Sequence, residues 1–420
     1  MVSRGGWVSG SEPFVTWCAP SRLSLEKTVN ILQVTPYFPP AWAYGGPPRV
    51  IYELSRELVR QGHAVTTLTT DALDSRRRAA PRRETIDGIE VVRLRNLSNA
   101  LAWHQAFLPV GVISFVRKHI DDFDIVHLHT LRTVQNALIH RFSSRHGTPY
   151  VLSAHGSVQR IVRQTTLKAI FDQLTGNRLL RDARKLIAQS NVERREYESA
   201  GVPGAKISVV SNGIDASMYE NLPAPGGFAK SFDLDGKHLI TYLGRLSPGK
   251  GLDDLCAAFR EILQVRQDCV LVVAGPDDGY QSQLARLAER LSMSDRVLFT
   301  GYLGSLQKLQ LLVDSAVIVY PAAYESFGLV PVEALLCGTP VVVSKETGCG
   351  ELIERAQAGI TFSFGDMARL RDALLAVLED GQTMGPMVRR GRDFILRELN
   401  WTRISKEMES IYASAITTAN

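Results

Sequence analysis

Cysteine is scarce in this sequence, and its spacing supports neither a disulfide framework nor a metal site. The five cysteines are an odd number spread over 420 residues, with no C-x-x-C pair and no Cys/His pattern of metal-ligand spacing. Scattered cysteines of this kind are typical of a protein in a reducing compartment. We therefore expect no structural disulfide and no metal.

Long apolar runs are missing as well. The stretch from Leu329 to Val343 is one of the longest, but Glu333 interrupts it, and it is shorter than the roughly 20 residues that span a bilayer. Residues 1–27 have only Arg4 in the position of a basic n-region and no continuous apolar segment, so they do not resemble a signal peptide. We expect a loose extension at residues 1–27, no transmembrane helix and a cytoplasmic protein.

A large excess of charge is also missing. The chain has 48 Lys and Arg against 43 Asp and Glu, a formal net charge of +5. This excess is too small for a nucleic-acid-binding protein of this length, so we expect no nucleic-acid partner. Hydrophobic residues make up 45% and charged residues 22%, a balance that is typical of a globular protein and excludes disorder as the main state.

Short β-branched apolar runs alternate with amphipathic stretches of helical length, which predicts parallel strands joined by crossover helices in an α/β fold. The first series of expected strands covers residues 29–35, 64–70, 89–94, 124–129, 149–154, 185–189 and 207–210. The second series covers residues 238–243, 269–274, 296–300, 316–320, 340–343 and 359–362. Two doubly wound, Rossmann-like domains facing each other across a cleft follow from this pattern, with ligands at the carboxyl ends of the strands.

The domain boundaries are predicted from a segment rich in proline and glycine. The segment at 221–228 holds two prolines and two glycines without periodicity and is typical of a connection between domains. We therefore expect an N-terminal domain at 28–215, a linker at 216–236 and a C-terminal domain at 237–398. Residues 399–420 are expected to carry an amphipathic helix, since Trp401, Ile404, Met408, Ile411 and Tyr412 share one helical face.

Two glutamates follow the strand that ends at Tyr320. Glu325 falls in the loop, and a helix is expected to begin near Phe327, which places Glu333 in its early turns. Free amides at a helix N-terminus form an anion site, and the two carboxylates could hold hydroxyls at either end of a ligand whose phosphates meet that terminus. Two solvated glutamates at a helix start are the alternative interpretation.

A glycine-rich loop with two fixed cations follows the strand at 238–243. Arg245 and Lys250 stand five residues apart at the start of the next helix, an arrangement that suits a diphosphate, although an exposed basic turn is the alternative. Gly251 follows the lysine where a P-loop needs Ser or Thr, which disfavours kinase or ATPase chemistry. No G-x-G-x-x-G follows any strand, which disfavours a nicotinamide or flavin dehydrogenase.

In this order and at these strand ends, the motifs resemble the retaining, sugar-nucleotide-dependent glycosyltransferases of the GT-B fold, family 4, also called glycosyl transferases group 1. The resemblance covers nearly the whole chain from about Ile31 to Tyr412. It rests on Tyr44-Gly45-Gly46-Pro47-Pro48, Gly62-His63, Ala154-His155-Gly156, Gly244-Arg245-x4-Lys250-Gly251 and Glu325-x7-Glu333. It also implies that the last helix crosses back to the N-terminal domain.

The resemblance implies roles for individual residues. Arg245 and Lys250 would bind the donor diphosphate and stabilise the departing nucleoside diphosphate. Glu333 would hold the ribose hydroxyls, Glu325 the hydroxyls of the transferred hexose, and His155 would touch the donor sugar, with a capped turn histidine as its alternative reading. Gly46 would let the backbone approach the phosphates. The remaining implied donor-binding residues, which include helix amides, are Ser326, Phe327, Gly328, Leu329 and Val330.

The implied activity is transfer of a hexose, with retention and without metal, from a nucleoside-diphosphate sugar to a saccharide or lipid-linked acceptor. The sugar nucleotide would be a co-substrate and no cofactor is expected. Such transfer builds cell-surface polysaccharide, lipopolysaccharide or glycolipid. Two other functions stay open: a nucleotide-sugar epimerase of the same fold, and a non-catalytic nucleotide-sugar-binding subunit.

A basic amphipathic stretch suggests one further partner. Residues 158–185 interleave Arg and Lys with apolar residues, which is typical of a surface that lies on anionic lipid, although a solvated helix face has the same pattern. Arg76-Arg77-Arg78 and Arg82-Arg83 add a basic loop between the second and third expected strands. An anionic membrane surface, at the inner face of the membrane, is therefore a candidate partner.

Overall fold

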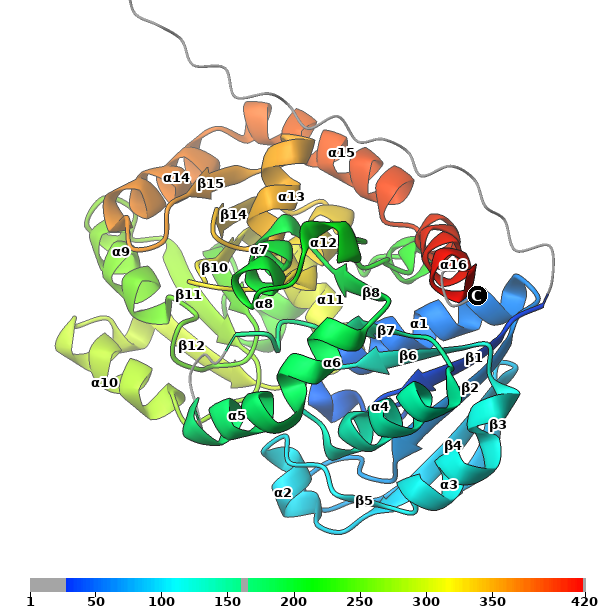
Figure 1. Cartoon of the computed structure of the whole chain (residues 1–420). Coiled ribbons are helices and arrows are strands. Elements are labelled where there is room, and N and C mark those ends of the chain that lie inside the picture. The colour runs from blue at the N-terminus through cyan, green and yellow to red at the C-terminus, as the bar shows by residue number, and fades with distance from the viewer. Residues whose placement is uncertain (1–27, 160–164, 418–420) are drawn as a thin grey trace, which may run out of the picture.

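The computed structural model describes residues 28–159 and 165–417, so the expected extension at 1–27 and the residues Arg160 and Arg163 of the basic stretch lie outside the described part. The described chain forms two α/β units, each built around one twisted sheet, which we call the N-terminal and C-terminal units (Figure 1). The expected α/β class is confirmed.

The sheet of the N-terminal unit has nine strands in the order β3-β4-β2-β1-β6-β7-β8-β9, with β5 paired to β4. Their bounds are β1 (Asn30–Val34), β2 (Ala64–Thr70), β3 (Arg83–Ile86), β4 (Ile89–Asn96), β5 (Pro109–Val110), β6 (Ile125–His129), β7 (Tyr150–Ser153), β8 (Lys185–Ala188) and β9 (Ile207–Val209). All pairs are parallel except β3 and β5, which run antiparallel to β4. The sequence predicted neither of these short strands, and Arg83, the first residue of β3, was expected in a basic loop.

Seven α-helices cover this sheet within the described residues. They are α1 (Gly46–Arg60), α2 (Asn99–Trp103), α3 (Val112–His119), α4 (Val134–His146), α5 (Thr165–Phe171), α6 (Asn177–Asp182) and α7 (Asn191–Ser199). Gly46, Pro47 and Pro48 form the first turn of α1, and Gly45 precedes it as the N-cap residue. Proline suits this position, since its missing N–H would have no partner in a first turn and its φ is already helical.

The sheet of the C-terminal unit is wholly parallel, in the order β12-β11-β10-β13-β14-β15. Its strands are β10 (His238–Leu243), β11 (Cys269–Ala274), β12 (Val297–Gly301), β13 (Ser315–Tyr320), β14 (Val341–Ser344) and β15 (Ile360–Phe362). Its helices are α8 (Gly227–Ser231), α9 (Leu252–Val265), α10 (Gln281–Arg290), α11 (Ser305–Asp314), α12 (Leu329–Leu336), α13 (Gly348–Ala356), α14 (Met367–Glu379) and α15 (Gly381–Glu398). The strand order reverses between β10 and β13, and ligands bind at such a switch point in doubly wound sheets.

Two features tie the chain together around these sheets. The segment expected as a linker at 216–236 contains α8, whose Phe228 is 1% exposed and belongs to the core of the C-terminal unit. The last helix, α16 (Trp401–Thr417), packs against α1 and buries Trp401 and Tyr412 in the core of the N-terminal unit. Figure 1 shows the red α16 beside the blue α1.

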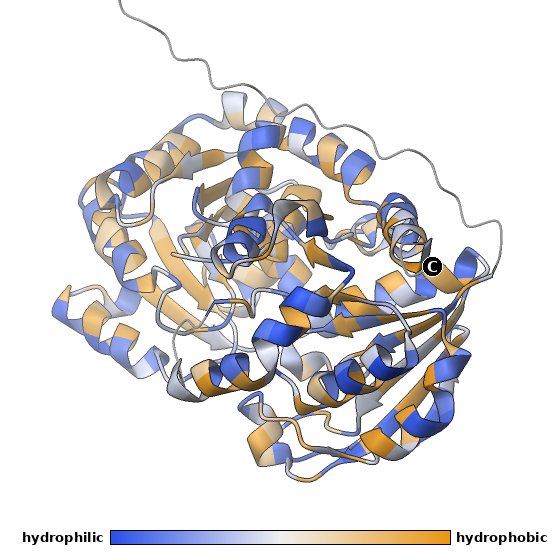
Figure 2. Ribbon diagram, viewed as in Figure 1, coloured by the Kyte–Doolittle hydropathy of each residue, from blue (hydrophilic) through white to orange (hydrophobic). Residues whose placement is uncertain are grey.

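The hydropathy of the chain matches this layering, since the strands are largely apolar and the helices are blue on their outer faces (Figure 2). No helix in the described ranges combines the length and the apolar composition that crossing a bilayer requires.

Candidate active site

The two motifs that stand apart in the sequence meet at the switch point of the C-terminal sheet. Lys250, in the loop after β10, places its Nζ 2.8 Å from Glu325 Oε2, in the loop after β13. Tyr320 donates its hydroxyl to the same carboxylate oxygen over 2.9 Å. The Lys250 and Glu325 side chains are 19% and 25% exposed, so the pair is held in place but remains open to a ligand.

Glycine allows these two loops to touch. Gly251 has φ of 68°, and a Cβ at this position would lie 1.9 Å from the carbonyl oxygen of Pro321. One backbone hydrogen bond, from Ala323 N to Gly249 O at 2.9 Å, joins the same loops. Any side chain at position 251 would therefore force the loops apart and separate Lys250 from Glu325.

Arg245 supplies a second cation that has no carboxylate partner among the described residues. Its side chain is exposed, and its charge lowers the pKa of Tyr37, which burial otherwise raises strongly. Because Tyr37 follows β1, Arg245 is within electrostatic reach of the N-terminal unit. The site thus has one paired and one unpaired cation beside the same strand end.

Two helix N-termini converge on this place. Gly328, with φ of 83°, precedes α12, which begins at Leu329 and so starts two residues later than expected. A Cβ on Gly46, the first residue of α1, would lie 3.7 Å from Leu329 Cδ1. Both helices therefore point their unpaired amide groups, which carry partial positive charge, at the same region.

Two of the expected donor-binding residues have buried side chains. Ser326 is 6% exposed and donates its hydroxyl to Gln189 Oε1 over 3.2 Å, and Phe327 is 3% exposed in the core of the C-terminal unit. A ligand could reach these two residues only through their backbone.

Glu333, in the second turn of α12, has two partners that the sequence did not indicate. Lys308 Nζ, on α11, lies 2.8 Å from Glu333 Oε1. Burial and the neighbouring Glu333 carboxylate both raise the pKa of Tyr219, which stands in the segment between the two units. Nothing in the local sequence places Lys308 or Tyr219 at this glutamate, since the three come from separate segments.

His155 does not present a free ring nitrogen. Its Nδ1 lies 2.6 Å from Gln189 Nε2, and its Nε2 lies 2.9 Å from His129 Nδ1. The residue adopts a left-handed φ of 52°, and burial lowers the pKa of its imidazole to about 4. The structure therefore holds His155 in a network as a neutral ring, so direct contact of its nitrogens with a donor sugar would require that network to open.

The network continues to the last helix. His129 Nε2 meets Gln33 Oε1 at 2.7 Å, and Gln33 Nε2 donates to the Tyr412 hydroxyl over 3.4 Å. Tyr412 in turn contacts His127 Nδ1 at 2.7 Å. If both His129 and His155 carry their proton on Nε2, every hydrogen bond from Gln189 to Tyr412 has one donor and one acceptor. An added proton on either ring would break one of these bonds.

This chain of neutral rings predicts an acid-sensitive N-terminal unit. Burial lowers the pKa of His127 and His129 well below the usual 6.5, so the unfolded state binds more protons as pH falls through 6.5. Each such histidine should lower the free energy of unfolding by about 1.4 kcal/mol as the pH falls from 7.5 to 5.5. The measurement is urea unfolding followed by tryptophan fluorescence, because the three tryptophans in the described ranges, Trp42, Trp103 and Trp401, all belong to this unit.

The pH dependence of wild type alone is not enough, because buried glutamates with raised pKa values stabilise the fold as the pH falls and so offset the effect of the histidines. The test therefore compares His127→Gln with wild type. The loss between pH 7.5 and 5.5 should be about 1.4 kcal/mol smaller in the variant than in wild type. His104→Gln, which changes an exposed histidine, serves as the control. An equal pH dependence in wild type and His127→Gln would contradict the neutral-ring assignment.

The described part of the chain contains no cluster of metal-ligating side chains. Across residues 28–159 and 165–417, no group of three His, Cys, Asp or Glu side chains is arranged to hold an ion. Asp122 and Asp124 form an Asp-x-Asp sequence, a pattern that can hold a metal. Here Asp124 accepts a hydrogen bond from the amide of Asn30 over 2.7 Å and Asp122 pairs with His119 at 3.0 Å, so both serve the local fold.

The basic segments are partly neutralised. Arg77 and Arg78 pair with Asp74 and Asp71, at 2.5 Å and 2.8 Å. On the described part of 158–185, Arg178 and Arg184 are exposed, as are the apolar Ile170 and Leu174. Contact with an anionic membrane remains a prediction.

Comparisons with known proteins agree with this geometry. The family model described as Glycosyltransferase Family 4 matches residues 44–218, and the model described as Glycosyl transferases group 1 matches residues 228–394. An uncharacterised glycosyltransferase of Methanocaldococcus jannaschii is 27% identical over 89% of this chain and 97% of its own length. The glycogen synthase of Mycobacterium tuberculosis is 26% identical over 92% of this chain and 95% of its own.

Solved structures share the fold at low sequence identity. Sucrose-phosphate synthase from Thermosynechococcus elongatus superimposes with a TM-score of 0.74 at 19% identity, over 93% of this chain and all of its own. HepE of Anabaena, in complex with UDP-glucose, superimposes with a TM-score of 0.71 at 21% identity, over 92% of this chain and all of its own. With two family models that together span most of the sequence, the chain belongs to the group 1, family 4 glycosyltransferases and has the GT-B fold.

Proposed function

We propose that this glycosyltransferase moves a hexose, with retention and without metal, from a nucleoside-diphosphate sugar to a saccharide or lipid-linked acceptor of the cell surface. The observation that carries this proposal is the Lys250 and Glu325 pair at the switch point, with Arg245 beside it. Glycogen synthase and sucrose-phosphate synthase among the relatives, and the complex of HepE with UDP-glucose, support a hexosyl donor.

The diphosphate is the ligand that this site would suit best. Two cations and the N-termini of α1 and α12 surround the region, and a diphosphate carries two or more negative charges. These same groups would bind the departing nucleoside diphosphate more tightly as negative charge develops on it, which is the electrostatic share of catalysis.

Glu325 suits a binding role better than a nucleophilic one. Its Oε2 already accepts hydrogen bonds from both Lys250 and Tyr320, which lowers its reactivity toward an anomeric carbon. The carboxylate could still accept hydrogen bonds from hydroxyl groups of the hexose. Retention would then follow from attack on the face that the leaving group occupies, with the departing phosphate oxygen taking the proton of the acceptor.

Calorimetric titration with the glucose conjugates of UDP, GDP, ADP and dTDP tests this proposal. We expect micromolar binding of one member of the panel, unchanged by excess EDTA, because the protein's own cations would neutralise the diphosphate. Binding that appears only with added Mg²⁺ or Mn²⁺ would contradict the metal-independent site.

Product analysis separates transfer from epimerisation. Incubation of the bound donor with saccharide acceptors should give a glycoside whose anomeric configuration, read by NMR, equals that of the donor. Conversion of the donor to its epimer without any acceptor would instead support the epimerase.

A further inference from the structure

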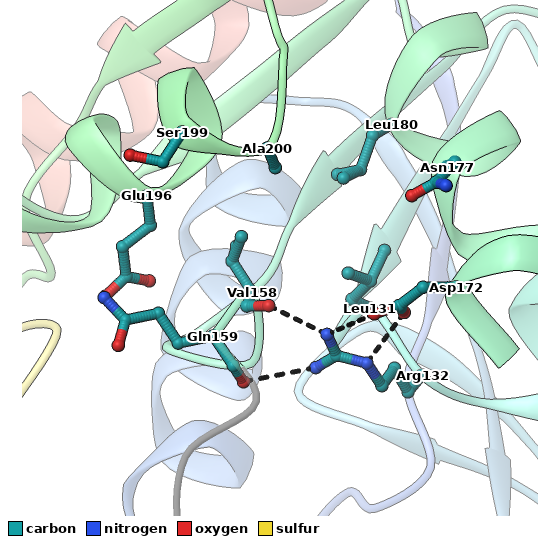
Figure 3. Close-up of a pocket in the computed structure, with 10 residues that line it drawn as sticks. All are labelled: Leu131, Arg132, Val158, Gln159, Asp172, Asn177, Leu180, Glu196, Ser199 and Ala200. Carbon is teal, nitrogen blue, oxygen red and sulfur yellow. Dashed lines mark hydrogen bonds and ion pairs between the residues drawn. The ribbon is translucent and has the colours of Figure 1, made fainter. Parts of the chain in front are cut away.

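A cavity of about 420 Å³ lies in the N-terminal unit, outside the Lys250 and Glu325 site. In Figure 3, α7 lies on one side of it, α6 and the segment after β6 lie on the opposite side, and the segment after β7 lies between them. Its lining combines apolar side chains, among them Leu131, Val158 and Leu180, with Arg132 and Glu196. An apolar wall opposite hydrogen-bonding groups is typical of a small-molecule site.

The arginine in this cavity has no capacity left for an anion. Arg132 Nε and Nη2 donate to the two carboxylate oxygens of Asp172, each over 2.8 Å. Nη2 also donates to the Val158 carbonyl over 2.8 Å, and Nη1 donates to the carbonyl of Ser157. Figure 3 shows the bonds from the guanidinium to Asp172, to Val158 and, over 3.4 Å from Nη1, to the carbonyl of Gln159. A phosphate group entering the cavity would find this cation already neutralised.

Glu196 differs from Arg132 because its charged group lacks good hydrogen-bond partners among the described residues. Glu196, on α7, is 5% exposed, and neither of its carboxylate oxygens makes a hydrogen bond of normal geometry in the described part of the chain. The hydroxyl of Tyr324 is close enough to lower the pKa of Glu196, but burial outweighs it and raises that pKa to about 7. A buried carboxylate without good partners is costly, so its presence on a cavity wall points to a ligand that supplies hydrogen-bond donors.

Tyr324 connects this cavity to the site at the switch point. It stands in the loop after β13, next to Glu325, and the charges of Glu196, Glu193 and Glu325 all raise its pKa further, beyond the effect of burial. Its hydroxyl is therefore near the carboxylate of the cavity, and it is within electrostatic reach of the carboxylate at the switch point. A ligand held by Glu196 would therefore lie near Tyr324, the residue next to Glu325.

We propose that this cavity binds one uncharged sugar ring of the acceptor, with Glu196 accepting hydrogen bonds from its hydroxyls and the apolar wall packing on its C–H face. This assignment rests on the proposed function, because it requires a sugar-nucleotide donor at the neighbouring site. It disfavours a phosphorylated ring here, because the Glu196 carboxylate would repel an anion and Arg132 is already neutralised by Asp172. An acceptor phosphate would have to lie elsewhere on the surface.

Saturation-transfer NMR in the presence of UDP tests the assignment. The probes are the methyl glycosides of glucose, galactose, mannose and N-acetylglucosamine, and the 6-phosphates of the same sugars. At least one neutral glycoside should bind wild type, and Glu196→Gln should weaken it about tenfold, since a charge-assisted bond becomes a neutral one. Glu198→Gln, on the same helix but in an exposed ion pair with Arg194, should bind like wild type.

Three results would overturn the assignment: a sugar phosphate that binds better than its neutral counterpart, equal binding of the glycoside to Glu196→Gln, or no glycoside bound while UDP binds. Thermal melting at pH 8 checks the fold, and Glu196→Gln should melt no lower than wild type because it removes a buried charge. Glycoside binding without binding of UDP would count against the proposed function and leave the cavity assignment standing.

Discussion

Replacing Lys250 with alanine should lower kcat/KM for sugar transfer by about 10²–10³-fold, the usual cost of removing one group that stabilises charge in a transition state. The change removes the cation that pairs with Glu325 at 2.8 Å and leaves Arg245 as the remaining cation of the loop. Transfer should fall more than donor binding, because the negative charge on the leaving group is largest in the transition state. Steady-state kinetics and calorimetry on the same preparation give both quantities.

The fold should tolerate this substitution. The ion pair is partly exposed, and pairs of this kind contribute about 1 kcal/mol or less. Lys237→Ala, an exposed lysine of the same unit, is the matched control and should transfer sugar like wild type. If Lys250→Ala kept full activity, or if it lost activity only together with a large drop in melting temperature, the assigned role would be wrong.

Replacing Gly251 with alanine should destabilise the C-terminal unit by about 3 kcal/mol or more. The left-handed φ of 68° costs alanine roughly 1–2 kcal/mol, and the new Cβ would lie 1.9 Å from a backbone oxygen, which cannot move aside like a flexible side chain. The loops after β10 and β13 would separate, so activity should be lost even in the fraction that folds.

Gly249→Ala is a close control for that experiment. Gly249 also has a left-handed φ, of 82°, but a Cβ there would meet no atom within 4 Å, so it should cost only the roughly 1–2 kcal/mol of backbone strain. Residues 104–400 contain no tryptophan, so far-UV circular dichroism must follow this unit while fluorescence follows the other. Similar stability losses in the two variants would show that the clash with Pro321 is relieved at little cost.

Strand positions could be predicted well because parallel strands buried on both faces are continuous apolar runs. Every strand expected in the two series is present within two residues at each end. The exceptions are informative. The hairpin from β3 to β4 turns at Asp87 and Gly88, both with positive φ, and Asp-Gly is a strong hairpin signal that the search for apolar runs did not use. The residues of β3 are exposed or half-buried, so they form no such run.

The meeting of Lys250 and Glu325 could be predicted because each follows a strand, and β10 and β13 are neighbours in this fold. The partners of Glu333 could not, since Lys308 and Tyr219 reach it from separate segments. The state of His155 depends on His129 and Gln189, from two other strand ends. One sequence signal did exist: His127 and His129 alternate on a buried strand, which indicates a buried polar network.

The contact of Tyr412 with His127 and Gln33 also sets an order of events in time. Both sheets are complete once residue 362 has been synthesised, yet the network that supports His155 needs a side chain 50 residues further along the chain. A growing polypeptide on the ribosome can therefore contain every residue of the diphosphate site while the loop of His155 still lacks its outermost support. The enzyme reaches its finished form only when translation has passed the final helix.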